Sequence, residues 1–337
     1  MAGSDKPGRF IFGRYSFENR PVILAPMEDI TDPPFRHLCK ELGADWVYTE
    51  FISADGLVRD AVKSIKKLDI SPGERPVSIQ IFGANIEAMV GAAVLAEQAS
   101  PDFIDINFGC PVRKVASKGA GSGIMNDVPK MVDMTRRIVD AVSTPVTVKT
   151  RLGYDQQNKH IVDIAERLQD CGIAALAIHG RTRCQMYRGT ADWSLIGEVK
   201  NNPRMHIPII GNGDIVDGPS ARQAIDSYGV DGIMVGRACI GNPWIFSEVK
   251  HFLKYGDPPA PPTLKEKLDV CRRHLDMSVT WKGEKTGLFE MRRHYGNYFK
   301  GLPNFKPYRM QLVTAPSLEE VNRVLQEVEE AFTGETR

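Results

Sequence analysis

Short apolar runs recur along the first 240 residues of the chain, separated by segments with apolar residues at helical spacing. The runs are nearly continuous rather than alternating, as expected of parallel strands that are buried on both faces. Their starts lie about 25 to 40 residues apart, the length of a strand, a helix and two loops. They occupy residues 22–27, 46–50, 76–82, 103–108, 145–151, 175–180, 207–213 and 232–237.

Eight such units predict an α/β fold of the (β/α)8 type, a TIM barrel. The alternative is a doubly wound sheet, which usually has fewer strands and a GxGxxG turn after its first strand. No such turn follows residues 22–27. Helix signals lie between the runs, because Asp32, Asn85 and Asp217 are suited to cap helix N-termini and Gly172 is suited to end a helix.

The pattern changes after the last apolar run. Residues 258–262 contain four prolines in five positions, which indicates a stiff linker. Beyond it only helical patterns remain, at about residues 264–281, 284–300 and 318–332. We therefore expect a barrel domain over residues 1–250 and a small helical domain over residues 258–337.

Composition narrows the class of protein. The chain has 337 residues, of which 42% are hydrophobic and 25% charged, as in ordinary soluble domains. It contains no apolar run long enough to cross a membrane and no apolar signal core at its N-terminus, so we expect no membrane association. The six cysteines form no CxxC pair, which argues against zinc and for a reducing cytoplasm. With a net charge of +1, any contact with nucleic acid must come from local basic patches.

The strongest chemical signal follows the fourth apolar run. That run ends in Gly109-Cys110-Pro111 and a basic, glycine-rich loop that contains Lys114 and Lys118. A loop at a strand end with a free thiol is a candidate site, and the alternative is a buried structural cysteine. We expect the two lysines to lower the pKa of the Cys110 thiol from its usual value of about 8.5.

Polar residues end nearly every predicted strand, and in a barrel these ends surround one mouth. Backbone N–H groups at residues 212–214 and 236–237, with the Arg237 guanidinium, suit a phosphate. Lys149 can stabilise negative charge on a reduced ring. The remaining rim suits a flat ring with hydrogen-bonding edges, so we predict flavin mononucleotide, FMN. The rim residues are Pro26, Met27, Gln80, Asn107, Cys110, Lys149, Arg151, His179, Asn212, Gly213, Asp214, Gly236 and Arg237.

At these positions the sequence resembles the tRNA-dihydrouridine synthases, flavoproteins that reduce uridine in tRNA. Met27-Glu28-Asp29 replaces the more usual Met-Ala-Gly of that family. The tail is most similar to the bacterial B-type branch. The matching motifs occur in order at residues 25–36, 105–111, 149–151, 179–183, 211–214, 232–237, 241–246 and 292–301.

The resemblance implies reduction of the C5–C6 double bond of uridine to 5,6-dihydrouridine, with FMN as cofactor and NADPH as reductant. Cys110 would act as the general acid that protonates C5. Flavin-ring contacts would come from Pro26, Met27, Gln80, Lys149 and His179, and phosphate-end contacts from Asn212, Gly213, Asp214, Gly236 and Arg237. Substrate contacts would come from Asn107, Arg151, Arg181 and Arg183.

A tRNA partner requires the target base to leave its stack, with basic loops around the mouth to hold the backbone. In the tail, Tyr295, Tyr298 and Phe299 lie among basic residues, and they either face RNA or pack in a core. No stable protein partner is evident. Two alternatives remain, an FMN barrel that acts on a free pyrimidine, as dihydroorotate dehydrogenases do, and a non-catalytic RNA-binding protein.

Overall fold

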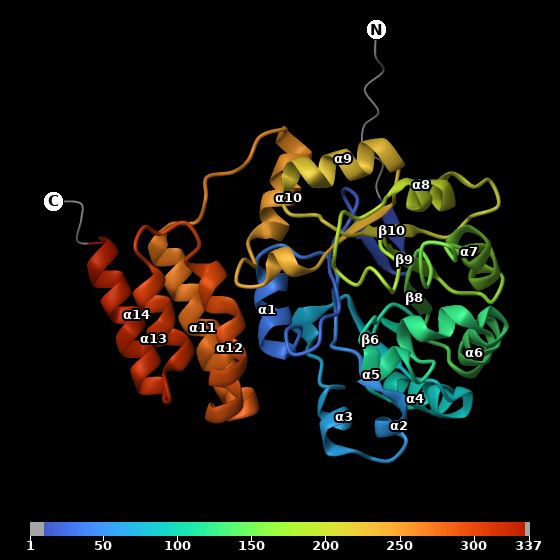
Figure 1. Cartoon of the computed structure of the whole chain (residues 1–337), viewed down its shortest axis with the longest axis horizontal. Coiled ribbons are helices and arrows are strands. Elements are labelled where there is room, and N and C mark those ends of the chain that lie inside the picture. The colour runs from blue at the N-terminus through green and yellow to red at the C-terminus, as the bar shows by residue number, and fades with distance from the viewer. Residues whose placement is uncertain (1–9, 334–337) are drawn as a thin grey trace, which may run out of the picture.

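The computed structural model describes residues 10–333, which form a barrel with a helical domain beside it (Figure 1). All strands of the barrel pair in parallel, in the order β3-β11-β10-β9-β8-β7-β6-β4, and β5 (Ile52–Ser53) also pairs with β6. A bridge between Ile23 and Trp46 joins the first and last strands of this order. The predicted (β/α)8 barrel with a C-terminal helical domain is confirmed. The eight strands are β3 (Val22–Leu24), β4 (Val47–Tyr48), β6 (Val77–Phe82), β7 (Phe103–Asn107), β8 (Val146–Arg151), β9 (Ala175–His179), β10 (Ile209–Asn212) and β11 (Gly232–Val235).

The strand register brings the predicted polar residues together. Asn107 pairs with Lys149 across β7 and β8, and Arg151 pairs with His179 across β8 and β9. His179 in turn pairs with Asn212 of β10. Because parallel strands in register end at one mouth, these side chains belong to one rim.

Helices cover the outside of the barrel, and three of them begin at caps that the sequence predicts. Asp32 accepts a hydrogen bond from Phe35 N at 3.0 Å, and Asn85 and Asp217 act in the same way at the starts of α4 and α9. The barrel helices are α1 (Pro33–Glu41), α2 (Ala54–Leu57), α3 (Val62–Lys66), α4 (Ile86–Gln98), α5 (Arg113–Ala116), α6 (Val128–Ala141), α7 (Ile161–Gln169), α8 (Ser194–Asn201), α9 (Gly218–Tyr228) and α10 (Ile245–Tyr255). Short 3-10 turns occupy Pro72–Glu74, Gly121–Asn126 and Arg237–Cys239.

A hairpin of β1 (Phe10–Phe12) and β2 (Tyr15–Phe17) precedes the barrel, and the sequence pattern does not predict it. Its strands have three residues each, too short to show an alternating pattern. Phe12 stacks on Phe103, which begins β7, with ring centroids 4.7 Å apart. The hairpin therefore packs at the N-terminal end of the barrel, opposite the predicted site.

The helical domain consists of α11 (Leu264–Lys282), α12 (Glu284–Tyr298), α13 (Lys306–Thr314) and α14 (Leu318–Thr333). The sequence predicts the other three but not α13, which is short and has a proline in its first turn. The domain has a hydrophobic core of its own, and Tyr295, Tyr298 and Phe299 are buried in it. Of the two interpretations of these aromatic residues, core packing is the correct one.

Two buried histidines of the helical domain contact α1 of the barrel. The rings of His274 and His294 lie 5.2 and 4.9 Å from the ring of Phe35 and 4.6 Å from each other. His294 Nδ1 also accepts a hydrogen bond from Gly241 N of the barrel at 3.1 Å. Burial lowers the pKa of His274 to about 3 and that of His294 well below its usual value. Both rings are therefore neutral at physiological pH.

We expect stability to fall as the pH drops below about 6.5, the pKa of a histidine in the unfolded chain. The folded pKa values are depressed, so below this pH the unfolded state takes up protons that the folded state does not. Each of the two histidines then lowers the free energy of unfolding by up to about 1.4 kcal/mol per pH unit. Urea unfolding between pH 7 and pH 5 measures the slope, which His274→Gln should reduce and the same change at the exposed His206 should not. Equal slopes in all three proteins would contradict the assignment.

Candidate active site

One cavity of about 1160 Å³ lies at the C-terminal ends of the strands and reaches the helical domain. Residues of the helical domain at its edge include Lys267, Asn297, Tyr298 and Lys300. Most of the predicted site residues line this cavity, which makes it the candidate active site. They are Pro26, Met27, Asn107, Cys110, Lys149, Arg151, His179, Asn212, Gly213, Asp214, Gly236 and Arg237.

Three predicted residues do not line the cavity. Gln80 is buried behind it, where its Nε2 donates to Asp105 Oδ2 at 2.6 Å and its Oε1 accepts from Asn107 Nδ2 at 2.8 Å. Arg181 is buried and pairs with Asp214 at 2.7 Å. Arg183 lies over the ring of Tyr154, 5.3 Å from its centroid. The geometry makes Gln80 and Arg181 supports of cavity residues rather than parts of the wall.

The loop that carries Cys110 is held by hydrogen bonds on both sides. Asn107 Oδ1 accepts from the N–H groups of Gly109 and Cys110 at 3.0 and 2.8 Å. The carbonyl of Cys110 accepts from the N–H and the hydroxyl of Ser122 at 3.1 and 2.7 Å. The network therefore holds Cys110 in the cavity wall, where 7% of the residue's surface is exposed.

The Cys110 thiol is protonated at neutral pH. Burial raises its pKa, and the nearby Glu28 carboxylate acts in the same direction, against the opposing effects of Arg151 and Lys149. The expectation that Lys114 and Lys118 lower this pKa is wrong, because both side chains are exposed and burial dominates. A protonated thiol is a proton donor rather than a nucleophile.

A group of cationic side chains lines the same cavity as Cys110. Burial and the neighbouring Arg151 lower the pKa of Lys149 to about 8, and burial lowers that of Arg151 to about 10. Burial and the same cations keep the pKa of His179 well below its usual value, so its ring is neutral. Like charges held this close indicate a site built for an anionic ligand.

Arg151 joins two loops of the mouth. Its Nε donates to the Gly109 carbonyl at 2.6 Å, and its Nη1 donates to the carbonyls of Thr182 and Met186 at 3.1 and 2.9 Å. The guanidinium thus fixes the backbone next to Cys110 as well as lining the cavity.

Tyr187 was missed by the sequence interpretation. Its ring centroid lies 5.6 Å from the Arg151 guanidinium carbon and 5.1 Å from that of Arg237, and it lines the cavity. The only signal was an aromatic residue within a basic loop. Lys267 and Asn297 of the helical domain were also missed, because their place depends on how the two domains dock.

The end of β10 provides a corner with little side-chain bulk. Gly213 has a φ of +128°, and a Cβ there would lie 2.8 Å from the Ala191 Cβ. A Cβ at Gly236 would meet only Ala25 and the Met27 sulfur, both beyond 3.7 Å. Asp214 pairs with Arg237 at 3.2 Å and orients its guanidinium beside this corner. The donor set of backbone N–H groups and one guanidinium fits a phosphate.

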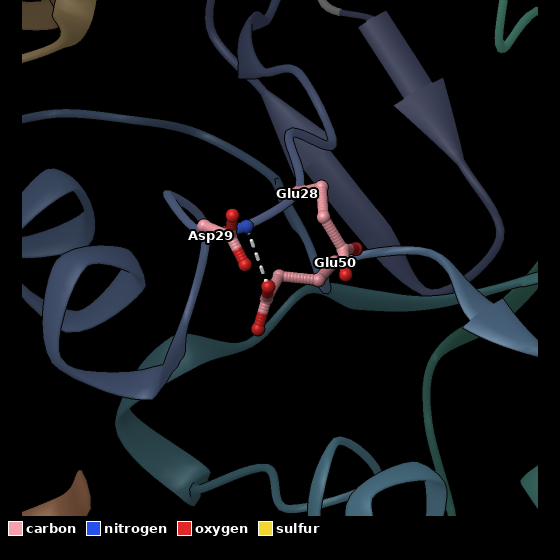
Figure 2. Close-up of side chains that lie close together, drawn as sticks. All are labelled: Glu28, Asp29 and Glu50. Atoms are coloured by element: carbon pink, nitrogen blue, oxygen red, sulfur yellow. Dashed lines mark hydrogen bonds between the residues drawn. The ribbon is translucent and has the colours of Figure 1, made fainter. Parts of the chain in front are cut away.

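Three carboxylates lie together (Figure 2), and one of them, Glu28, lines the cavity. Glu28, Asp29 and Glu50 each place one oxygen within 4.8 Å of the others. Lys67 pairs with Glu28 at 2.6 Å and with Glu50 at 3.3 Å, and Arg293 pairs with Asp29 at 2.9 Å. Because each of the three carboxylates pairs with a protein cation, and two of them share Lys67, the cluster is part of an ion-pair network.

Comparison with known proteins gives a consistent result. The family model described as dihydrouridine synthase matches residues 23–336. The chain is 38% identical to tRNA-dihydrouridine synthase B of Pseudomonas putida, over 88% of the chain and 87% of that protein. It is 41% identical to tRNA-dihydrouridine synthase B of Shewanella oneidensis, over 85% of the chain and 88% of that protein.

Solved structures with the same fold are more distant in sequence. A 2-naphthoyl-CoA reductase complex superposes with a TM-score of 0.57 at 13% identity, covering 72% of the chain and 51% of that protein. Histamine dehydrogenase from Rhizobium sp. 4-9 superposes with a TM-score of 0.56 at 12% identity, covering 80% of the chain and 50% of that protein. These two similarities support the barrel fold.

Proposed function

The chain belongs to the dihydrouridine synthase family, and from this premise we propose that it reduces the C5–C6 double bond of uridines in tRNA, with FMN as cofactor and NADPH as reductant. The observation that carries the proposal is the cavity itself. It combines a protonated thiol, a cationic wall and a phosphate-sized corner. We assign the reaction to the barrel, residues 1–250, and much of the tRNA contact to residues 258–337.

The chemistry of the residues that line the cavity suits FMN. Gly213, Gly236 and Arg237 would hold the phosphate, with Asn212 and Asp214 fixing that corner. Lys149, His179 and the backbone at Pro26 and Met27 would contact the ring, and Gln80 would support them through Asn107. When bound, FMN takes up hydride from NADPH and supplies it to the uracil ring.

The chain's own part in the reaction is to place one proton and to balance charge. The Cys110 thiol would give its proton to C5 of the uracil as C6 gains hydride, and water would later reprotonate the thiolate. Arg151 and Asn107 border the same space and would orient the base. Lys149 would balance negative charge at the cofactor ring.

The helical domain supplies cations to the mouth of the cavity. Lys267 and Lys300 line it. A uridine in folded RNA must be extruded to reach Cys110, so its flanking phosphates would pass this edge. No helix within the described residues is long and apolar enough to span a membrane. We propose that the enzyme meets tRNA in the cytoplasm.

We predict that Lys267→Ala and Lys300→Ala each weaken tRNA binding about fivefold, because each removes a cation at the cavity edge. The slope of log affinity against log salt should become less steep by about 0.7 to 0.9 for each lost phosphate contact. Filter binding or fluorescence anisotropy with unmodified tRNA measures both quantities. Lys265→Ala is the matched control, since this exposed lysine of α11 lies outside the cavity. An equal loss in the control would contradict a local role.

The proposed function has a direct test. The purified protein should be yellow, and tRNA that lacks dihydrouridine should stimulate its NADPH oxidation. Stimulation by free uridine or orotate instead would favour a barrel that acts on a free pyrimidine. A colourless protein that binds tRNA but oxidises no NADPH would favour a non-catalytic RNA-binding protein. Dihydrouridine in the product tRNA, detected by mass spectrometry, completes the assignment.

A further inference from the structure

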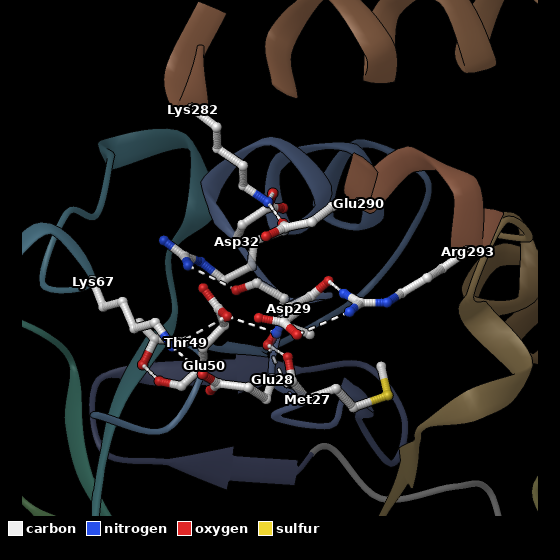
Figure 3. Close-up of polar contacts among 12 residues, drawn as sticks. Met27, Glu28, Asp29, Asp32, Thr49, Glu50, Lys67, Lys282, Glu290 and Arg293 are labelled. Carbon is white, nitrogen blue, oxygen red and sulfur yellow. Dashed lines mark hydrogen bonds and ion pairs between the residues drawn. The ribbon is translucent and has the colours of Figure 1, made fainter. Parts of the chain in front are cut away.

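The helical domain holds, from outside, a turn whose inner side forms part of the cavity wall (Figure 3). This turn follows β3, and Met27 and Glu28 on it line the cavity. Thr31 closes the turn, because its N–H donates to the Met27 carbonyl at 3.0 Å and its Oγ1 accepts from Met27 N at 3.0 Å. Residues 27–31 are therefore one compact unit, and a shift at one end moves the wall.

Asp29 has an unfavourable backbone conformation within this unit. Its φ is +56°, in the left-handed region that glycine adopts freely and residues with a Cβ adopt rarely. Some interaction of the aspartate must therefore compensate for the conformation.

Arg293 of α12 provides that interaction. Its Nη1 donates to the Asp29 carbonyl at 3.0 Å, and its Nη2 donates to Asp29 Oδ2 at 2.9 Å. The planar guanidinium thus contacts the backbone and the side chain of one residue, a geometry that lysine cannot reproduce. On the barrel side, Asp29 N donates to Glu50 Oε1 at 2.7 Å, and Lys67 pairs with Glu50 and Glu28.

A second cation of the helical domain holds the far end of the turn. Lys282 pairs with Asp32 and with Glu290 of α12, and Asp32 is the residue that caps α1. Figure 3 shows Lys282 and Arg293 reaching the turn from the helical domain, while Met27 and Glu28 lie on its other side. The docking of the helical domain is thus connected by named contacts to the cavity wall.

We propose that Arg293 is a positioning residue for the flavin site. It holds Asp29 in the left-handed conformation, which keeps Met27 and Glu28 in the cavity wall, and so makes flavin affinity depend on the docked helical domain. This inference rests on the proposed FMN site and adds the helical domain to the determinants of cofactor binding.

The test uses the full chain with FMN removed and then titrated back. Arg293→Gln should raise the dissociation constant of FMN about tenfold. Without Arg293 only a fraction of the molecules has residues 27–31 in the conformation that binds FMN, and the apparent affinity falls in proportion to that fraction. Hydrogen exchange of the flavin-free protein gives a second measurement. The amides of Ile30 and Thr31, which donate to the Met27 carbonyl, should exchange faster in the variant.

Two variants separate positioning from general docking. Arg273→Gln removes a different ion pair between the domains, with Glu41 at the end of α1, and should leave FMN affinity unchanged. Asp29→Gly added to Arg293→Gln should restore FMN affinity to within about threefold of wild type, since glycine needs no support at this φ. The double variant still lacks the ion pair, so recovery identifies the conformation of the turn as the target.

Three outcomes would overturn the inference. These are wild-type amide exchange at Ile30 and Thr31 in Arg293→Gln, equal loss of FMN affinity in Arg273→Gln, and no recovery with Asp29→Gly. If the wild-type protein itself binds no FMN, the proposed function fails, and the exchange measurement still decides whether Arg293 holds the turn.

Discussion

A Cys110→Ala enzyme should form dihydrouridine about one hundred to ten thousand times more slowly than wild type, the usual cost of losing a positioned general acid. The thiol lies in the cavity wall, and burial keeps it protonated at neutral pH. Its loop is held by Asn107 and Ser122 through backbone atoms, so alanine should leave the loop in place. The variant should therefore still bind FMN and tRNA and accept hydride from NADPH.

Stopped-flow absorbance separates these steps, because flavin reduction by NADPH and flavin reoxidation by tRNA are recorded in different experiments. Only reoxidation should be slow in Cys110→Ala. Cys184→Ala is the matched control, since Cys184 is an exposed cysteine that does not line the cavity. Reoxidation of Cys110→Ala at the wild-type rate would return Cys110 to the alternative of a structural cysteine.

The pH dependence of reoxidation provides an independent check. The acid form of Cys110 is the active one, so the rate should fall as the pH rises through its pKa. Burial raises that pKa, which places the fall above about 8.5, the usual value of a thiol. A fall near neutrality would instead indicate a thiol activated by Lys114 and Lys118.

The sequence predicts the barrel well because one physical constraint governs all its strands. Strands covered on both faces must be continuously apolar, and their polar ends must meet at one mouth. The cavity residues from Pro26 to Arg237 follow from that rule. The hairpin at residues 10–17 and helix α13 do not, since three-residue strands and a nine-residue helix carry too little periodic signal.

The roles of the polar residues were harder to predict than their positions. Gln80 lies within β6 and Arg181 follows β9, yet both bind other protein groups and neither lines the cavity. Arg293 lies among basic residues of the tail in the sequence, but it pairs with Asp29 of the barrel. Whether a charged side chain faces a ligand or another residue depends on contacts distant in sequence, which a local pattern does not contain.

The second large effect is expected at Lys149. Lys149→Ala should slow flavin reduction by NADPH about one hundred to one thousand times, the range found when one positioned donor to developing negative charge is removed. Burial and the neighbouring Arg151 lower the Lys149 pKa to about 8, so its proton is lost more readily than from an ordinary lysine. The cation is the active form, and wild-type reduction should therefore slow as the pH rises past about 8. A bound anion moves this limit upward.

Lys149→Ala should remove that pH dependence together with the rate, which distinguishes loss of a specific charge from damage to the cavity. Stopped-flow reduction at several pH values measures both, at saturating FMN so that weaker binding does not enter. Lys63→Ala is the control, since Lys63 is exposed and lies outside the cavity. The two rates should also fall at different pH values. Flavin reduction should fall near pH 8 with the charge of Lys149, and reoxidation should fall at higher pH with the proton of Cys110. If Lys149→Ala kept the wild-type rate and pH profile, the charge that balances the reduced ring would have to come from Arg151, the other cation of the same wall.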